Sequence, residues 1–241
     1  MRKLLLASFF LLSMLARPVS GEGVNLAWND CGGSSASTSD QTFACDDDAH
    51  RFSLVGSFTP PGGISHLTAA EGYLDVVSAG SDLPDWWKID PGVGCRSGSL
   101  TSQIDFDGML GCTDYWGGQA AVGCQFYSGI GGPGHGQIRF VTSIAQTYAS
   151  AVSPGREYYA FKLVLGTRGT TGNTCGGCST GLCIVVTSFQ LDQRDGDGDY
   201  LMTRAGVRNY VTWQGGGPSC PGASAPTVRK NTWGQVKNMY R

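Results

Sequence analysis

The stretch CIVVTSFQLDQ, residues 183–193, carries the strongest strand signal in the C-terminal half of the sequence. It is rich in β-branched and aromatic residues and runs without glycine or proline, as β-strands do. Strict alternation predicts two sides, with Val185, Thr187, Phe189 and Leu191 on one and Ile184 and Val186 on the other. This strand predicts a sheet protein.

Shorter strand candidates precede residues 183–193, separated by clusters of Gly, Pro, Ser and Asp. They cover residues 24–28, 51–58, 72–78, 100–106, 137–144 and 157–165, and YVTW at 210–213 adds another. The stretches 137–144 and 157–165 alternate cleanly, which predicts one solvent-facing side for each. Because no helical segment of 10 to 15 residues lies between the strands, we predict an all-β, antiparallel β-sandwich, Ig-like or jelly-roll-like, with long Gly-rich loops.

Both ends of the chain lack this alternation of short strands and polar loops. Residues 1–21 have a basic start and the apolar run LLLASFFLLSMLA, which predicts a secretory signal peptide cleaved after Gly21, with Ala16 as the alternative. Residues 22–241 then form a single domain, and no later stretch approaches the roughly 20 apolar residues of a transmembrane helix. The predicted location is secreted, extracellular or at the cell surface, with the periplasm as an alternative.

The C-terminal stretch TWGQVKNMYR, residues 232–241, predicts one short helix. Thr232 is placed as an N-cap with Gln235 three residues later, and Trp233, Val236 and Met239 or Tyr240 follow helical spacing.

The net charge of the chain limits the kinds of partner that it is expected to bind. Residues 22–241 contain 14 basic and 19 acidic residues, a net charge of −5. An acidic chain lacks the electrostatic footprint for nucleic acid or an anionic membrane, so neither is expected.

All nine cysteines lie beyond the signal peptide, where disulfides are the expected use. We predict the pairs Cys31–Cys45, Cys95–Cys112 and Cys175–Cys178, and leave Cys124, Cys183 and Cys220 open. Since nine is odd, at least one thiol is free, buried or paired between chains, and an oligomer or assembly joined through an unpaired cysteine is one use for it.

The stretch Gly177-Cys178-Ser179-Thr180-Gly181 matches G-x-S-x-G, and Cys175 and Cys178 are spaced as in redox or zinc sites. A nucleophile elbow needs a strand before the serine and a helix after it, whereas the strand here comes after. The cysteine pair likewise lacks a following helix and a matched second pair. We therefore interpret the stretch as a disulfide-braced turn.

Asp195, Asp197 and Asp199 alternate with glycine in DGDGDY. Crowded carboxylates in a glycine loop suit Ca²⁺, which would favour bringing them together. The alternative is an exposed hairpin turn, for which Asp-Gly is a common signal. No cofactor is required on the second interpretation.

Four aromatic residues beside loops, Trp86, Trp87, Tyr115 and Trp116, suit sugar stacking next to aspartates. The alternative for the same residues is packing that closes the ends of a sandwich.

The stretches NLAWNDC, LPDWWK, DYWGGQAA, TWQGGG, CPGA and TWGQVKNMYR together cover most of residues 22–241. In these stretches the chain resembles a group of uncharacterised exported bacterial cysteine-containing proteins. The resemblance implies export and one shared domain, and it brings no assigned activity.

Because each catalytic motif fails in its context, we predict a secreted non-catalytic binding or assembly protein at or outside the cell surface. Its partner would be a glycan or another surface or protein partner. The alternative is an extracellular carbohydrate-binding module or a carbohydrate-active hydrolase on a β-sandwich scaffold, whose carboxylates would meet in space.

Overall fold

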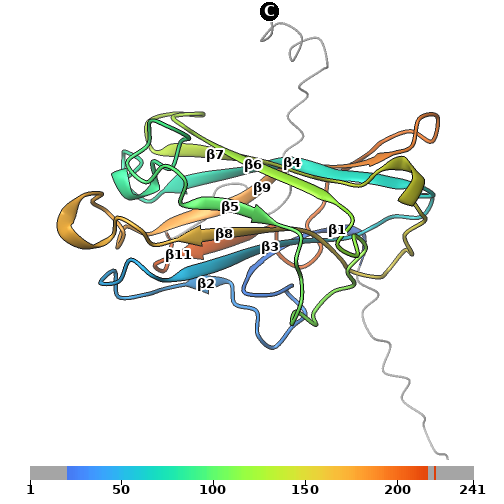
Figure 1. Cartoon of the computed structure of the whole chain (residues 1–241), viewed down its shortest axis with the longest axis horizontal. Coiled ribbons are helices and arrows are strands. Elements are labelled where there is room, and N and C mark those ends of the chain that lie inside the picture. Colours follow the sequence, from blue (N-terminus) through green and yellow to red (C-terminus); the bar gives the residue numbers. More distant parts are fainter. Residues whose placement is uncertain (1–20, 217–219, 221–241) are drawn as a thin grey trace, which may run out of the picture.

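The computed structural model describes residues 21–216 and residue 220, and within them the chain folds into two packed β-sheets (Figure 1). The smaller sheet has the order β1-β3-β8-β5, formed by Gly23–Trp28, Arg51–Thr59, Tyr158–Gly166 and Leu100–Gln103. The larger has the order β2-β11-β9-β4-β7-β6, formed by Asp40–Gln41, Tyr210–Trp213, Leu182–Gln193, Leu67–Ser78, His135–Ser143 and Ala121–Ser128. β10, Tyr200–Met202, also pairs with β9.

Every strand pair is antiparallel except β11 with β2. Only three 3-10 turns interrupt the strands of the described chain: η1 (Asp85–Trp87), η2 (Gln146–Tyr148) and η3 (Thr171–Asn173). The strands run along the long axis and the loops gather at its ends (Figure 1). The predicted all-β, antiparallel β-sandwich is confirmed.

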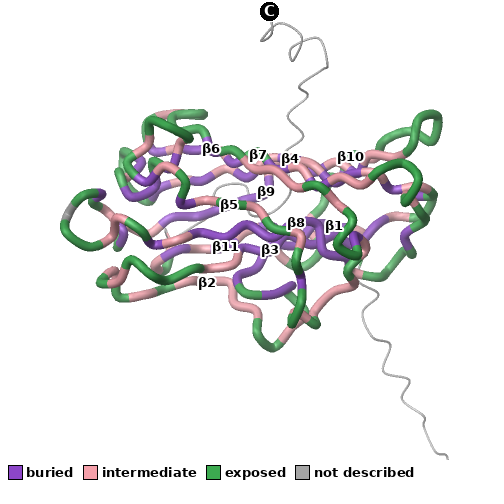
Figure 2. Tube along the Cα trace, in the orientation of Figure 1, coloured by how far each residue is buried: buried purple, intermediate pink, exposed green. Residues whose placement is uncertain are grey.

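The core lies between the sheets, where buried segments follow the strands while exposed ones collect in the end loops (Figure 2). Phe140 of β7 packs against Phe161 of β8 with ring centroids 4.1 Å apart, and Phe58 of β3 meets Phe189 of β9 at 5.8 Å. Each pair joins one sheet to the other, so aromatic rings carry much of the contact that holds the sandwich together.

The two sides of β9 are not the ones that strict alternation predicts. Leu182, Ile184 and Val186 join the core, but so do Phe189 and Leu191, so the inward register shifts by one residue in mid-strand. The shift occurs where β9 has a bulge opposite Tyr73 and Leu74 of β4. One extra residue in a bulge moves every later side chain to the other face, which is why the predicted sides of β9 are wrong.

A glycine makes this bulge possible. A Cβ added at Gly72 of β4 would overlap the carbonyl oxygen of Ser188, so the two strands approach too closely there for any side chain.

The outer face of the smaller sheet is covered by the β5–β6 loop, residues 104–120. Phe106 of this loop stacks on Tyr159 of β8, with centroids 4.4 Å apart, and the Lys162 ammonium donates to the Asp105 carbonyl. All residues of β8 except Gly166 are buried. The prediction that 157–165 has a solvent-facing side is therefore wrong, because a loop distant in sequence covers it.

The described cysteines form four disulfides: Cys31–Cys112, Cys45–Cys178, Cys95–Cys175 and Cys183–Cys220. The predicted pairs Cys31–Cys45, Cys95–Cys112 and Cys175–Cys178 are therefore wrong, although all six cysteines are bonded. The actual bonds join residues 37 to 133 positions apart, because the sheets bring distant loops together. Cysteines bonded in this number are those of a protein that matures in an oxidising compartment.

The predicted signal peptide, residues 1–21, and the predicted helix, residues 232–241, fall outside the described residues, except for Gly21. In the part that the structure describes, no helix has the length and apolar character to cross a membrane.

Candidate functional site

The predicted sugar-stacking tryptophans lie in the core. Trp86, Trp87 and Trp116 are 0%, 1% and 1% exposed, so none offers a ring face to a ligand. Tyr115 is partly buried, and its hydroxyl donates to the Leu67 carbonyl at 2.6 Å and accepts from the Ser150 amide at 2.9 Å. Burial contradicts the ligand-binding interpretation for the tryptophans and favours the alternative, in which these rings close the sandwich.

Trp86 shows what this packing does. The guanidinium of Arg96 lies 3.5 Å from its ring centroid, and Trp213 stacks on it at 4.9 Å. Arg96 also donates to the carbonyls of Arg168 and Trp86, each at 2.8 Å, and of Gly166. Burial lowers the pKa of Arg96, and the carbonyls and the aromatic face stand in for the water that its charge has lost. The cluster braces one end of the sandwich.

The G-x-S-x-G stretch is a turn that leads into β9. Cys178 is bonded to Cys45 and its carbonyl accepts from the Trp213 indole at 2.9 Å, while Cys175 is bonded to Cys95. Gly177 has a φ of +96°, which favours glycine at that position. The two cysteines of C-G-G-C therefore form disulfides with cysteines of two different loops. The interpretation of the stretch as a disulfide-braced turn is confirmed.

The aspartates predicted to bind calcium lie in the β9–β10 loop, where Asp195 is exposed and Asp197 and Asp199 face separate partners. Asp197 is 2.7 Å from Nδ1 of His66, and Asp199 accepts from the Gln193 amide at 3.1 Å. Among residues 21–216 and 220, no group of three His, Cys, Asp or Glu residues is arranged to hold a metal ion. The stretch is the exposed loop of the β9–β10 hairpin, and calcium binding stays a prediction.

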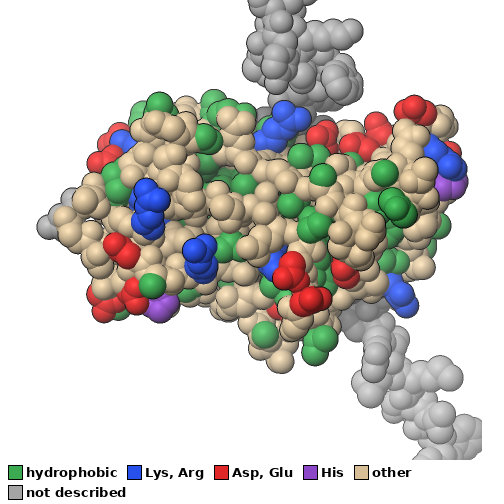
Figure 3. All heavy atoms as spheres, in the orientation of Figure 1, with side chains coloured by type: hydrophobic (Ala, Val, Ile, Leu, Met, Phe, Trp, Pro, Cys, Tyr) green, Lys and Arg blue, Asp and Glu red, His purple; other side chains and the backbone are tan. Residues whose placement is uncertain are grey.

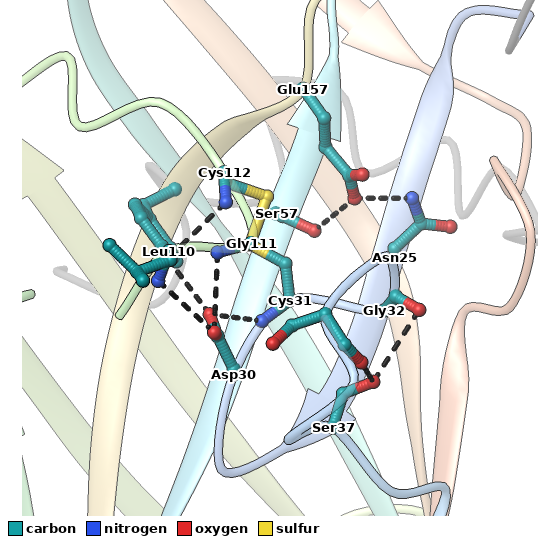
Figure 4. The surroundings of a disulfide bond; sticks show 12 residues. Asn25, Asp30, Cys31, Gly32, Ser37, Ser57, Leu110, Gly111, Cys112 and Glu157 are labelled. Atoms are coloured by element: carbon teal, nitrogen blue, oxygen red, sulfur yellow. Dashed lines mark hydrogen bonds between the residues drawn. A yellow bond between two sulfur atoms is a disulfide. The ribbon is translucent and has the colours of Figure 1, made fainter. Parts of the chain in front are cut away.

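Asp30 is a buried carboxylate beside the Cys31–Cys112 disulfide (Figure 4). Its Oδ1 accepts from the Cys31 amide at 2.7 Å and the Tyr159 hydroxyl at 2.8 Å, and its Oδ2 accepts from the amides of Leu110 and Gly111, both at 3.2 Å. Burial alone would raise the pKa of Asp30, but these hydrogen bonds outweigh it and hold the pKa below its ordinary value.

The Asp30 carboxylate also shifts the pKa of Tyr159, whose hydroxyl donates to it. Burial, followed by the hydrogen bond to Asp30, raises the pKa of Tyr159 to about 12. Since every acceptor site of Asp30 faces the protein, we assign this group to bracing the loop over the smaller sheet.

The outer face of the larger sheet is covered only in part: Cys183 and Val185 of β9 are 2% and 1% exposed, whereas the side chains on β4, β7 and β6 remain partly exposed. On β4 and β7, Leu74, Val76, Ile138 and Phe140 point into the core, so their neighbours in sequence point outward. What we call the open face is formed by Glu71, Tyr73 and Asp75 of β4, Gln137, Arg139 and Val141 of β7, Gln125 and Tyr127 of β6, and Thr187 and Gln190 of β9.

Side chains on the open face are held by their neighbours. Asp75 accepts from the Gln137 amide at 2.8 Å and from the Thr187 hydroxyl at 3.3 Å, across three strands. Arg139 lies 3.6 Å from Glu71, and both remain partly exposed, at 47% and 34%. The Gln137 amide and the Asp75 carboxylate are thus oriented before any ligand arrives, whereas Arg139 forms an exposed ion pair.

Two tyrosines lie among these polar groups. The register places Tyr73 opposite Arg139, and Tyr127 opposite Gln137. Tyr127 is 36% exposed and Tyr73 is intermediate. The alternation of residues 137–144 predicts the solvent-facing side of β7, but no strand is predicted from the sequence around Tyr127, which lies on β6.

Cys124 is the free cysteine among the described residues. It lies on β6 within hydrogen-bonding reach of Ser102 on β5, and burial raises the pKa of its thiol. A half-buried thiol of raised pKa is a poor nucleophile, which disfavours its use in joining two chains.

No family model matches the sequence, and no curated protein matches it. Among solved structures, the chain is similar to a cohesin module from a Clostridium perfringens ATCC13124 family 33 glycoside hydrolase. That similarity has 12% identity and a TM-score of 0.36, and it covers 79% of this chain and 93% of that one.

The chain is also similar to the C-terminal domain of the Streptococcus pyogenes antigen I/II-family protein AspA. Here the identity is 14% and the TM-score 0.29, over 79% of this chain and 46% of that one. At these TM-scores neither likeness carries an argument. The described residues by themselves define the class, a disulfide-braced antiparallel β-sandwich with one open sheet face.

Proposed function

We propose that this chain is an exported, non-catalytic binding protein that holds a glycan on the open face. The observation that carries the proposal is the asymmetry of the sandwich: a loop covers the outer side of the smaller sheet, whereas the larger sheet presents tyrosines among fixed polar groups. A covered sheet face needs no partner, but an open one is available for binding.

The chemistry of the open face suits a sugar. A pyranose ring has an apolar side that stacks on an aromatic ring and hydroxyls that pair with planar polar groups. Asp75 and Gln137 hold each other at 2.8 Å and border Tyr127, while Arg139 borders Tyr73. Each tyrosine thus has a neighbour that can bind the hydroxyls of the sugar stacked on it.

The two tyrosines are spaced for one oligosaccharide. Tyr73 and Tyr127 lie two strands apart and one side-chain row apart, which corresponds to about 12 Å from a strand spacing of about 4.8 Å and a rise of about 3.3 Å per residue. A short linear glycan can contact both rings at once, which favours a chain over a single sugar.

Charge supports a ligand of this kind. Figure 3 shows the side on which the smaller sheet lies, where basic and acidic side chains form small separate groups without an extended cationic patch. The net charge of −5 for residues 22–241 favours an uncharged ligand over a polyanion.

A glycan array followed by affinity measurement on the best hit tests the proposal. We expect Tyr127→Ala to weaken binding about tenfold, or ~1.4 kcal/mol. The matched control is Tyr148→Ala, because Tyr148 is 58% exposed but lies in η2, away from the open face.

Equal losses in Tyr127→Ala and Tyr148→Ala, or no bound glycan on the array, would contradict the proposal. Release of new reducing ends from a bound glycan would identify the hydrolase alternative instead.

A further inference from the structure

One disulfide attaches the chain beside the open face, on the same side of the larger sheet. Cys183 lies on β9 between Leu182 and Ile184, which both point into the core, so its side chain points to the outer side of the larger sheet. Its bond to Cys220 therefore fixes residue 220 against that side. The 21 residues that follow, 221–241, start from this point of attachment.

The sequence after Cys220 is opposite in charge to the rest. Residues 221–241 contain four basic residues, Arg229, Lys230, Lys237 and Arg241, and no acidic one. Residues 22–220 contain ten basic and nineteen acidic residues. All the acidic residues are thus on the folded body, and the segment attached to it is purely cationic.

The open face has the complementary sign. Glu71 and Asp75 lie on it, with Asp192 at its far end on β9, against the single cation Arg139. Burial raises the pKa of Asp192; the hydrogen bond from the Gln190 amide opposes this shift, and repulsion from Glu71 and Asp199 adds to it. A cationic segment held nearby would relieve that repulsion.

The segment is long enough to cross the face. Nine residues of β9 separate Cys183 from Asp192, about 30 Å at ~3.3 Å per residue. The twelve residues 221–232 alone can extend about 40 Å, so Trp233 and Tyr240 can reach any part of the face. Because the segment is attached, its effective concentration at the face is in the millimolar range.

We infer that the open face binds the chain's own residues 221–241, and that this segment and an external ligand compete for it. The docking rests on the disulfide, the charges and the reach. The competition rests on the proposed function, because it assigns the external ligand to the same face.

Carbodiimide cross-linking of the full exported chain tests the docking, since it joins a lysine amine to a carboxylate in contact with it. We expect Lys230 and Lys237 to be joined to Glu71, Asp75 or Asp192 within monomers, and less so in 1 M salt, where the Debye length is about 3 Å. Lys88 is an internal control, because its amine lies 2.6 Å from Asp85.

Links spread over acidic residues away from the open face, or an absence of links while Lys88 still reacts, would overturn the docking. Links found only in covalent dimers would overturn it in favour of a second copy as the occupant.

The competition is tested by a variant with a neutral segment, Arg229→Gln, Lys230→Gln, Lys237→Gln and Arg241→Gln. If the segment occupies the face about 90% of the time, this variant binds the array hit about tenfold more tightly than the natural chain. Equal affinities would overturn the competition. If neither protein binds a glycan, the proposed function fails, while the cross-links still decide the docking.

Discussion

Replacing Asp30 by asparagine tests the buried network over the smaller sheet. The substitution keeps the shape of the side chain but exchanges one oxygen for an amide group that can only donate. The oxygen that remains can still accept from two of the present donors, Cys31, Tyr159, Leu110 and Gly111. The amide nitrogen must then face either the amides of Leu110 and Gly111 or the Cys31 amide and the Tyr159 hydroxyl, so at least one buried backbone amide loses its acceptor.

The expected loss follows from these contacts. Hydrogen bonds to charged groups contribute about 1.5–3 kcal/mol each, and two are lost. We expect Asp30→Asn to lower the free energy of unfolding by about 3 kcal/mol at pH 7. For a domain of this size that corresponds to a fall in Tm of about 6–12 °C.

The effect must depend on pH in a defined direction. Because the folded pKa of Asp30 is below its ordinary value of 3.8, its contribution is complete above that pH and is lost as the pH falls through the folded value. Acidification below about pH 4 should therefore destabilise the natural protein more than Asp30→Asn.

Urea unfolding of the oxidised protein at pH 7 and pH 3 measures both effects, with Asp46→Asn as the control, since Asp46 is exposed. An Asp30→Asn variant as stable as the control at pH 7, or one that loses stability on acidification in parallel with the natural chain, would refute the reasoning.

Two further predictions concern Cys124 and Arg96. Unfolding the unreduced exported chain with an alkylating reagent present should label one thiol, Cys124, whereas the native protein should react far more slowly because burial raises the pKa of that thiol. More than one labelled thiol, or a covalent dimer on a non-reducing gel, would contradict this. Arg96→Lys keeps the charge but cannot reach three carbonyls and stack on Trp86, so we expect the urea midpoint to fall by the equivalent of about 3 kcal/mol. A urea midpoint unchanged from that of the natural protein would show that the hydrogen bonds of the Arg96 guanidinium are not needed for stability.

Local pattern was sufficient to predict the sandwich and most of its strands, because side-chain alternation depends on neighbours in sequence, but it did not predict β6 or the short strands β2 and β10. It failed on β9 from Phe189 onward, because the bulge is imposed by the close approach of Gly72 and Ser188 on two different strands. It failed on residues 157–165 for a similar reason, since the loop that covers them is more than 35 positions away.

The disulfides show the same limit. Pairing cysteines that are near in sequence assumes that each loop is closed on itself. The sandwich instead places loops from different strands at the same end, so that Cys45 meets Cys178 across 133 positions.

The site was predicted least well, because tryptophan beside a loop has the same sequence pattern whether it packs or binds. Burial separates the two uses, and it removes Trp86, Trp87 and Trp116 while leaving Tyr127 at the surface. That the outer side of the larger sheet is the open one follows only from where the β5–β6 loop lies.

The measurement that tests the account most directly is a map of amide chemical-shift changes in the isotope-labelled exported chain, titrated with the highest-affinity oligosaccharide from the array. The account predicts changes on β4, β6, β7 and β9 around Tyr73 and Tyr127, and none around the buried Trp86. Changes confined to the end loops, with the open face unaffected, would contradict it.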